Sequence, residues 1–277
     1  MIDLHTHSNE SDGELSPTAL LELAKNSGMT ALALTDHDTL AGLAEAEEAA
    51  RHLNIRFVPG VEIEVDFEPG NFHILGLDIK QYPKGPLGNF LEEIREWRNS
   101  RNGKMVRLMN ADGLNVTLDE LNGLAGGEVL GRMHFADWLI ARGKARNVSD
   151  CFEKWLGVGC PYNVKGQRPK LRETAEVIRQ AGGKVIIAHP LSLWISWSCF
   201  EEYVPLWKEN GIDGIEALHS EASKKAAGKL TELARKNNML ITGGSDFHGS
   251  CRPDRCLGYG SGGISLSEEL LLQFDEA

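Results

Sequence analysis

Histidines and carboxylates recur in this sequence directly after short apolar runs that are typical of β-strands. His5 and His7 follow the first run, His37 follows the second, and Asp246 comes just after the last. In parallel α/β folds the carboxyl ends of the strands meet on one face, so we expect these side chains to converge. Imidazole nitrogens and carboxylate oxygens gathered in one place bind divalent metal ions, and without a metal ion such buried polar groups would lack partners. The pattern therefore predicts a metal site with nine candidate ligands: His5, His7, Asp12, His37, Glu62, His73, His189, Asp246 and His248.

Two closely spaced pairs among these candidates strengthen the prediction. In His5-x-His7 both imidazoles lie on the same side of an extended segment, because side chains alternate with a period of two. The pair can therefore bind one ion. Asp246-x-His248 repeats the spacing with one carboxylate and one imidazole.

The elements that must position these residues alternate between strands and helices. We expect strands at 2–4, 31–34, 57–61, 72–77, 184–188, 214–217 and 239–242, and helices at 17–26, 39–53, 171–181, 199–209 and 221–236. Repeated strand–helix units favour parallel strands joined by right-handed crossovers. Six or seven such units predict an α/β fold with a closed or nearly closed barrel.

A stretch between 84 and 165 breaks this alternation with three expected helices, at 89–111, 117–125 and 133–141. We interpret it as a helical subdomain inserted into a barrel formed by 1–83 and 166–277. Residues 84–170 hold 14 Lys and Arg against 10 Asp and Glu, whereas the whole chain carries a net charge of −11. This opposite charge favours a substrate-facing cap over a merely stabilising decoration.

The composition is that of an ordinary globular protein. Of the 277 residues, 42% are hydrophobic and 25% charged, and the mean hydropathy is −0.27. No apolar run approaches the ~20 residues of a membrane span, and the first residues do not resemble an export signal, so we expect a cytoplasmic protein. Five cysteines without a Cys-x-x-Cys favour reduced thiols. The net charge of −11 argues against binding of duplex DNA through a basic surface.

The candidate ligands lie in motifs that resemble those of the PHP (polymerase and histidinol phosphatase) family of metal-dependent phosphoesterases. The resemblance covers almost the whole chain, in the family's order. The motifs are Asp3-Leu4-His5-Thr6-His7-Ser8, Ser11-Asp12-Gly13, Thr35-Asp36-His37-Asp38-Thr39, Gly60-Val61-Glu62, His73, Ala188-His189-Pro190 and Gly244-Ser245-Asp246-Phe247-His248-Gly249. The resemblance implies a distorted (β/α)7 barrel of the PHP type with an inserted helical subdomain.

The resemblance also implies two to three divalent ions, with Mn, Fe and Zn all compatible with mixed nitrogen and oxygen ligands. It assigns His5, His7, Glu62 and Asp246 to a first ion. Glu62, His73 and His189 would hold a second, and Asp12, His37 and His248 a third. Three further carboxylates, Asp3, Asp36 and Asp38, are expected to orient histidines rather than bind metal.

Within the family the chain is most similar to the branch that acts on nucleotide phosphates, which has a helical insert and a Gly-Arg-Pro-His signature. Here the signature reads Gly131-Arg132-Met133-His134, and a later stretch departs from the branch's pattern. The resemblance implies that Arg132 and His134 bind substrate. Lys165 or Arg168 could supply a further positive charge.

Several other residues allow two interpretations. Glu64 should face the same side as Glu62, but the family usually has a small residue there. His219 follows a strand end, where it is either a proton donor or a structural or substrate-lining residue; we include it, with Asp246 and His189, among the candidate catalytic residues. Trp194 and Trp197 either stack a base or are buried.

The implied reaction is hydrolysis at phosphorus, with a nucleotide or short oligonucleotide as substrate. The first hypothesis is a 3′,5′-nucleoside bisphosphate phosphatase or an exonuclease that trims short oligonucleotides from the 5′ end. A second is a phosphatase for small monoesters such as histidinol phosphate. A third, a non-catalytic binding domain, is disfavoured because all nine ligands are present. We expect no binding to duplex DNA or membranes, and the oligomeric state cannot be read from the sequence.

Overall fold

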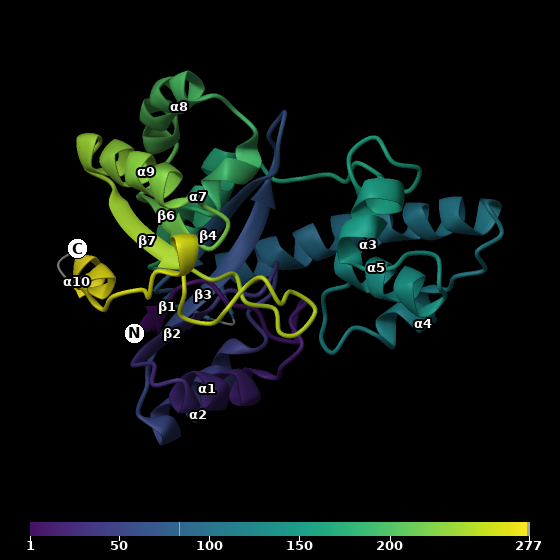
Figure 1. Ribbon diagram of the computed structural model, residues 1–277, viewed down its shortest axis with the longest axis horizontal. Helices are drawn as coiled ribbons and strands as arrows, with labels where there is room; N and C mark the ends of the chain where they lie inside the picture. The colour runs from purple at the N-terminus through teal and green to yellow at the C-terminus, as the bar shows by residue number, and fades with distance from the viewer. Residues whose placement is uncertain (83, 276–277) are drawn as a thin grey trace.

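Seven strands form a nearly closed barrel in the computed structural model, which describes residues 1–82 and 84–275 (Figure 1). The strands are β1 (Ile2–Asp3), β2 (Ala31–Leu34), β3 (Arg56–Val65), β4 (Phe72–Leu77), β5 (Lys184–Ile187), β6 (Gly214–His219) and β7 (Leu240–Gly244), and they neighbour one another in chain order. Beyond β1 and β7 the chain closes the ring, because the His7 N–H donates to the Phe247 carbonyl at 3.0 Å. The expected α/β barrel is confirmed.

One strand departs from the expected parallel arrangement. β4 pairs antiparallel with both β3 and β5, whereas the other neighbouring strands pair in parallel. The link between β3 and β4 is too short for the helical crossover that a parallel pair requires. As a result β4 begins at the end of the barrel where the parallel strands finish, and His73 near its start joins the residues there.

Six helices belong to the two barrel segments: α1 (Pro17–Asn26), α2 (Leu43–Leu53), α7 (Leu171–Gln180), α8 (Trp197–Glu209), α9 (Lys224–Lys236) and α10 (Glu269–Asp275), with the short 3-10 helices η2 (Pro190–Leu193) and η3 (Ser261–Gly263). α9 begins later than the expected 221, because the Ser223 hydroxyl caps the helix by accepting the Ala226 N–H at 3.2 Å. Among the described residues, no helix is long and apolar enough to cross a membrane.

Between β4 and β5 the chain forms α3 (Pro86–Ala111), α4 (Leu118–Asn122), α5 (Arg132–Ala141), α6 (Val148–Cys151) and the π-helix η1 (Phe152–Leu156). Figure 1 shows α3 running from the barrel into this group of helices. Leu91 and Ile94 near the start of α3 pack in the main core of the barrel. Met105 and Met109 near its end pack in a separate core with Phe135. α3 therefore belongs to both cores, and the division of the chain into a barrel (1–83 and 166–277) and an insert (84–165) remains our proposal. Pro83 and residues 276–277, which lie at the ends of the two barrel segments, are outside the described part.

The insert lies directly against the loop that follows β1. A Cβ atom on Gly127 would collide with the backbone of Glu10, so only glycine permits this close approach. On the other side, Arg95 Nη1 of α3 donates to the Asp38 carbonyl at 2.9 Å. These contacts hold the insert at the end of the barrel that carries the candidate ligands.

Candidate metal centre and active site

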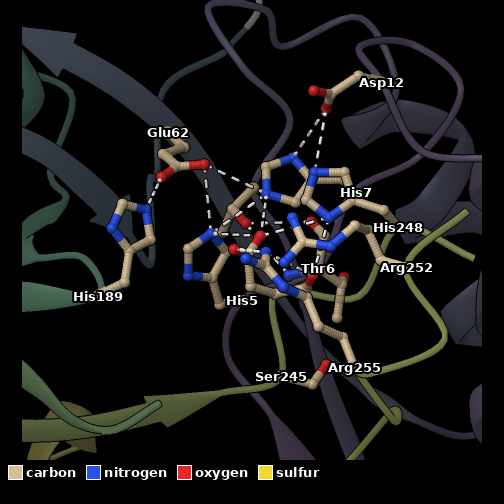
Figure 2. A network of polar contacts seen from close by, with 12 residues as sticks. His5, Thr6, His7, Asp12, Glu62, His189, Ser245, His248, Arg252 and Arg255 are labelled. Atoms are coloured by element: carbon tan, nitrogen blue, oxygen red, sulfur yellow. Dashed lines mark hydrogen bonds and ion pairs between the residues drawn. The ribbon is translucent and has the colours of Figure 1, made fainter. Parts of the chain in front are cut away.

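Glu62 lies at the centre of the candidate ligands, on β3. Its Oε2 atom is 3.2 Å from His7 Nε2, 3.3 Å from His5 Nε2 and 3.3 Å from His37 Nδ1. Asp246 Oδ1 lies 3.1 Å from the same His7 nitrogen. Ligand atoms from His5, His7, Glu62 and Asp246 all lie within 4.8 Å of one another, and this group is fully buried. Figure 2 shows His5, His7 and Glu62 turned toward one another.

The second carboxylate oxygen of Glu62 faces another pair of histidines. Oε1 lies 2.8 Å from His73 Nδ1 and 2.8 Å from His189 Nε2. His73 comes from antiparallel β4, and His189 directly follows Ala188 after β5. Glu62 thus connects the residues expected for a first and a second ion, as the resemblance implied it should.

A third group surrounds Asp12, in the loop after β1. Asp12 Oδ1 lies 3.3 Å from His248 Nε2 and 3.8 Å from His7 Nδ1, and Oδ2 lies 3.9 Å from His37 Nε2. Ligand atoms from these four residues also lie within 4.8 Å of one another. His7 faces the first group through Nε2 and this one through Nδ1. The structure therefore brings all nine predicted ligands together.

This donor set fits divalent metal ions. The Nε2 atoms of His5 and His7 face each other at 3.2 Å and face the same oxygen of Glu62. In the described part of the chain, His7 Nδ1 and His73 Nε2 are buried without a hydrogen-bond partner. Buried nitrogens that converge without partners are costly unless a cation satisfies them.

The protonation states also suit metal binding. Burial lowers the pKa of His37 to about 3 and that of His189 to about 4. Burial alone would raise the pKa of Glu62, but the surrounding imidazoles, His37 foremost, hold it well below its ordinary range. At neutral pH these histidines are therefore neutral and Glu62 is ionised, which are the forms that bind metal.

Glu216 on β6 orients two of the ligands and was missed in the sequence analysis. Its Oε1 atom accepts the Nδ1–H of His5 at 3.0 Å, so Nε2 is the nitrogen of His5 that faces the cluster and is left for a metal ion. Its Oε2 atom accepts the backbone N–H of His189 at 2.6 Å. The signal in the sequence was a single carboxylate within the apolar strand 214–219, since a buried charge needs a partner.

The three aspartates expected to orient histidines bind other groups instead. Asp3 accepts the backbone N–H groups of His5 and Ser245, at 3.2 and 3.0 Å. Asp36 accepts two serine hydroxyls, both at 2.6 Å. Asp38 accepts the Nε–H of Arg98 at 2.9 Å. Asp3 thus holds the backbone of His5, whereas Asp36 and Asp38 hold the segments around the candidate ligands; the role of all three in orienting histidines stays a prediction.

His219 is buried at the end of β6 beside Asp246. Its Nδ1 accepts the Glu221 N–H at 3.2 Å, so the proton of the neutral ring is on Nε2. That Nε2 lies 3.6 Å from Asp246 Oδ2, and burial lowers the pKa of His219 to about 4. Arg255, which the sequence analysis did not single out, forms ion pairs with both Asp246 and Glu221.

A cavity of about 430 Å³ opens over the ligand cluster, between the barrel and the insert. Its wall includes Glu62 and His189 from the barrel, and Phe152 from the insert. A second cavity of about 120 Å³ adjoins it. The two cavities share five lining residues: Glu64, Asn71, Arg98, Arg101 and Arg132.

Arginine side chains give the smaller cavity a positive lining: Arg98, Arg101, Arg132 and Arg168. Arg98 pairs with Asp38, and Arg168 Nη2 lies 2.8 Å from Glu64 Oε1. Within the described residues, Arg101 and Arg132 form no ion pair; the guanidinium of Arg101 donates to the side-chain amide oxygen of Asn102. Burial, and then the neighbouring arginines, lower the pKa of Arg101 to about 9. An anion in this cavity would relieve that repulsion.

The predicted substrate-binding residues fall in different places. Arg132 lines both cavities, and Arg168 and Lys165 line the smaller one. The Lys165 side chain is 75% exposed and pairs with Glu68. His134 is not among the lining residues; its Nδ1 accepts the Gly131 N–H at 3.0 Å at the start of α5. The structure thus brings Arg132 and Arg168 to the cavities and leaves Lys165 at the solvent edge.

Comparisons with known proteins are consistent with this site. The family model described as PHP domain matches residues 3–158. The chain is 36% identical to a 5′-3′ exoribonuclease of Haemophilus influenzae over 250 residues, covering 90% of each protein. It is 34% identical to a 3′,5′-nucleoside bisphosphate phosphatase of Chromobacterium violaceum over 260 residues, or 93% of this chain and 90% of that protein.

A solved structure shows the same architecture. A Bifidobacterium adolescentis protein assigned to the metal-dependent phosphoesterases superposes with a TM-score of 0.87 and is 28% identical, covering 98% of this chain and 94% of that one. The family match spans more than half of the chain, and the two enzymes are similar to it over nearly all of their length. This chain therefore belongs to the PHP domain family.

Proposed function

We propose that this protein is a metal-dependent phosphoesterase that hydrolyses phosphate esters of nucleotides. The substrate is a nucleoside 3′,5′-bisphosphate or the 5′ end of a short oligonucleotide. The similarity to an exoribonuclease and to a bisphosphate phosphatase supports the reaction class. The observation that carries the proposal is that the cavity over the ligand cluster adjoins a second one, lined by the guanidinium groups of Arg101 and Arg132, which form no ion pair within the described residues. The two cavities suit a substrate that has two phosphate groups.

The ligand cluster is proposed to hold two or three divalent ions, with Mn, Fe and Zn as candidates. His5, His7, Glu62 and Asp246 hold the first. Glu62, His73 and His189 hold the second, and Asp12, His37 and His248 the third, where one is bound. Ions at these positions supply a lowered pKa for water and neutralise charge on phosphate oxygens.

The remaining roles fall to side chains in and behind the cavity walls. Arg101 and Arg132 bind the phosphate that is not hydrolysed, and Arg132 can do so with two parallel hydrogen bonds. His219 is a neutral imidazole behind the cavity wall, with its hydrogen on Nε2, the nitrogen that faces Asp246; it positions this carboxylate rather than acting as a general acid. Glu64 orients Arg168, with which it is paired, rather than binding metal.

The test compares two substrates for the Mn²⁺-loaded enzyme and its Arg132→Ala variant. A charge-assisted hydrogen bond contributes about 1.5–3 kcal/mol, so kcat/KM for a nucleoside 3′,5′-bisphosphate should fall about 10–150-fold. An aryl phosphate, which has no second phosphate, should lose far less. Arg107→Ala is the matched control, since Arg107 is exposed on the same insert and does not line either cavity.

Two outcomes contradict the proposal. If the wild-type enzyme releases neither phosphate nor mononucleotide from a broad panel of nucleotides, the reaction class is wrong. If Arg132→Ala reduces turnover of both substrates equally, the second cavity does not bind phosphate, and a small monoester such as histidinol phosphate becomes the better substrate.

A further inference from the structure

Trp194 is an exposed tryptophan on the wall of the larger cavity. It follows the 3-10 helix η2, a few residues after His189, and its side chain is 59% exposed. The chain has six tryptophans, all in the described part, and the other five are buried or partly buried. Trp197, considered with it from the sequence, packs beside Phe200 at 5.6 Å between ring centroids. The two tryptophans therefore differ, and of the two only Trp194 lines the cavity.

The backbone at Trp194 adopts a left-handed conformation that bulky residues rarely take. Its φ is +53°, and a bulky side chain in this region costs roughly 1–2 kcal/mol. Of the eight non-glycine residues with positive φ in the described chain, six are Asp or Asn, which tolerate it. The other two are His189 and Trp194. The unusual backbone is thus concentrated in one short segment that joins a candidate ligand to the exposed ring.

Contacts with the turn between β3 and β4 hold this segment in place. The Ser192 carbonyl accepts the Asn71 N–H at 2.9 Å, and the Ser192 hydroxyl donates to the Asn71 carbonyl at 2.9 Å. His189 Nδ1 lies 2.9 Å from the same hydroxyl. A Cβ atom on Gly70 would collide with the Ser192 carbonyl oxygen. The segment is therefore fixed, while Trp194, its largest residue, stays 59% exposed.

The cavity wall identifies the kind of group that would cover this ring. Most of its lining residues are charged or polar; the apolar ones are Met133, Phe152, Leu191 and Trp194. A ligand that fills the cavity must place its anionic groups on the ion and arginine sides and an apolar, planar group against Trp194. A nucleobase has this shape, and bases stack on aromatic rings whatever their hydrogen-bonding pattern.

We propose that Trp194 is the stacking platform for the nucleobase of the substrate. The inference rests on the proposed nucleotide phosphoesterase function and deepens it. The pre-formed segment 189–194 then holds His189 at the reacting phosphate and Trp194 at the base of the same nucleotide. Stacking tolerates all four bases, so the enzyme is expected to act on each of them, with purines favoured by their larger area.

The experiment measures KM and kcat of the Mn²⁺-loaded enzyme with adenosine 3′,5′-bisphosphate and with the abasic ribose 3,5-bisphosphate. Stacking contributes about 1–3 kcal/mol per base, so Trp194→Ala should raise KM for the nucleotide about 5–150-fold. It should raise KM for the abasic compound far less. Trp194→Phe should retain most of the affinity. Trp194→Asn suits the left-handed backbone and should behave like Trp194→Ala. Tyr259→Ala, which changes an exposed aromatic residue outside the cavity, is the control.

The outcomes separate this inference from the function on which it rests. An unchanged KM for the nucleotide in Trp194→Ala overturns it. An equal rise in KM for the abasic compound also overturns it. Trp194 would then support the loop conformation or the binding of the phosphates rather than contact a base. If the wild-type enzyme hydrolyses aryl phosphates but no nucleotide, the proposed function itself fails, and the stacking role fails with it.

Discussion

Replacement of Glu216 by glutamine tests whether a residue outside the ligand set controls metal binding. Both carboxylate oxygens of Glu216 accept hydrogen bonds, from His5 Nδ1 at 3.0 Å and from the His189 backbone N–H at 2.6 Å. The amide of glutamine has one acceptor oxygen and one donor group. In Glu216→Gln the amide oxygen can therefore accept only one of these two hydrogen bonds, and the other donor then faces the N–H group of the glutamine amide. The side chain keeps nearly the same shape.

The size of the effect follows from that missing acceptor. Loss of a partner that orients a metal-binding histidine costs typically 10–100-fold in metal affinity, which is about 1.4–2.7 kcal/mol. Leaving a buried donor without a partner costs about 1–3 kcal/mol, in the same range. We therefore expect the Mn²⁺ concentration for half-maximal activity to rise about 10–100-fold.

The assay starts from metal-free protein and titrates Mn²⁺ while following phosphate release, with bound metal measured by elemental analysis. At saturating Mn²⁺ the variant should recover most of its kcat, because no ligand has been removed. Glu232→Gln, an exposed glutamate on α9, is the matched control. Thermal unfolding followed by circular dichroism checks that the variant is folded. An unchanged Mn²⁺ midpoint in a folded Glu216→Gln variant would refute the reasoning.

Two other predictions follow from charges at the site. Burial alone would lower the pKa of His5, but the carboxylates of Glu216 and then Glu62 raise it to about 10. The metal-free protein then holds a proton on His5 at neutral pH, so metal binding should release about one proton from it and strengthen as the pH rises toward 10. Titration calorimetry in buffers of different ionisation enthalpy measures this release. Metal binding without proton release would contradict the assignment of His5 as a ligand. Arg101→Met removes a buried guanidinium that has no ion-pair partner in the described chain. The melting temperature should therefore stay unchanged or rise, whereas KM for a nucleoside bisphosphate should increase. A large loss of stability would show that Arg101 supports the fold instead.

The convergence of the nine candidate ligands could be predicted from the sequence because strand ends in an α/β barrel lie on one face. His5, His7 and Asp246 come just after apolar runs, and period-two spacing indicated which of them share a side. The antiparallel direction of β4 was not predicted, although His73 still reaches the site. A helix is not needed between antiparallel strands, so the short link between β3 and β4 was the feature that mattered.

Other parts of the site could not be predicted because they depend on tertiary contacts. Arg255 lies in the irregular segment after β7, where no periodicity indicates which side chains turn inward. Arg98 and Arg101 lie on a long helix, and only the packing of that helix against the barrel decides which of its many charged residues face the cavity. Asp3 and Asp36 were recognised as supporting residues, but their partners are backbone and hydroxyl groups that spacing alone does not reveal.

The position of α3 accounts for how an acidic protein can offer the phosphate site that we propose. The helix has 26 residues and is therefore about 39 Å long, and it packs at one end on the barrel core and at the other in the insert core. Arg98 and Arg101 lie between these two packed ends, so their backbone is fixed relative to the ligand cluster. A net charge of −11 is spread over the whole molecule, whereas the cavities concentrate guanidinium groups where solvent screening is weakest. Under the proposed function, affinity for phosphate is therefore decided locally, by the same helix that attaches the insert to the barrel.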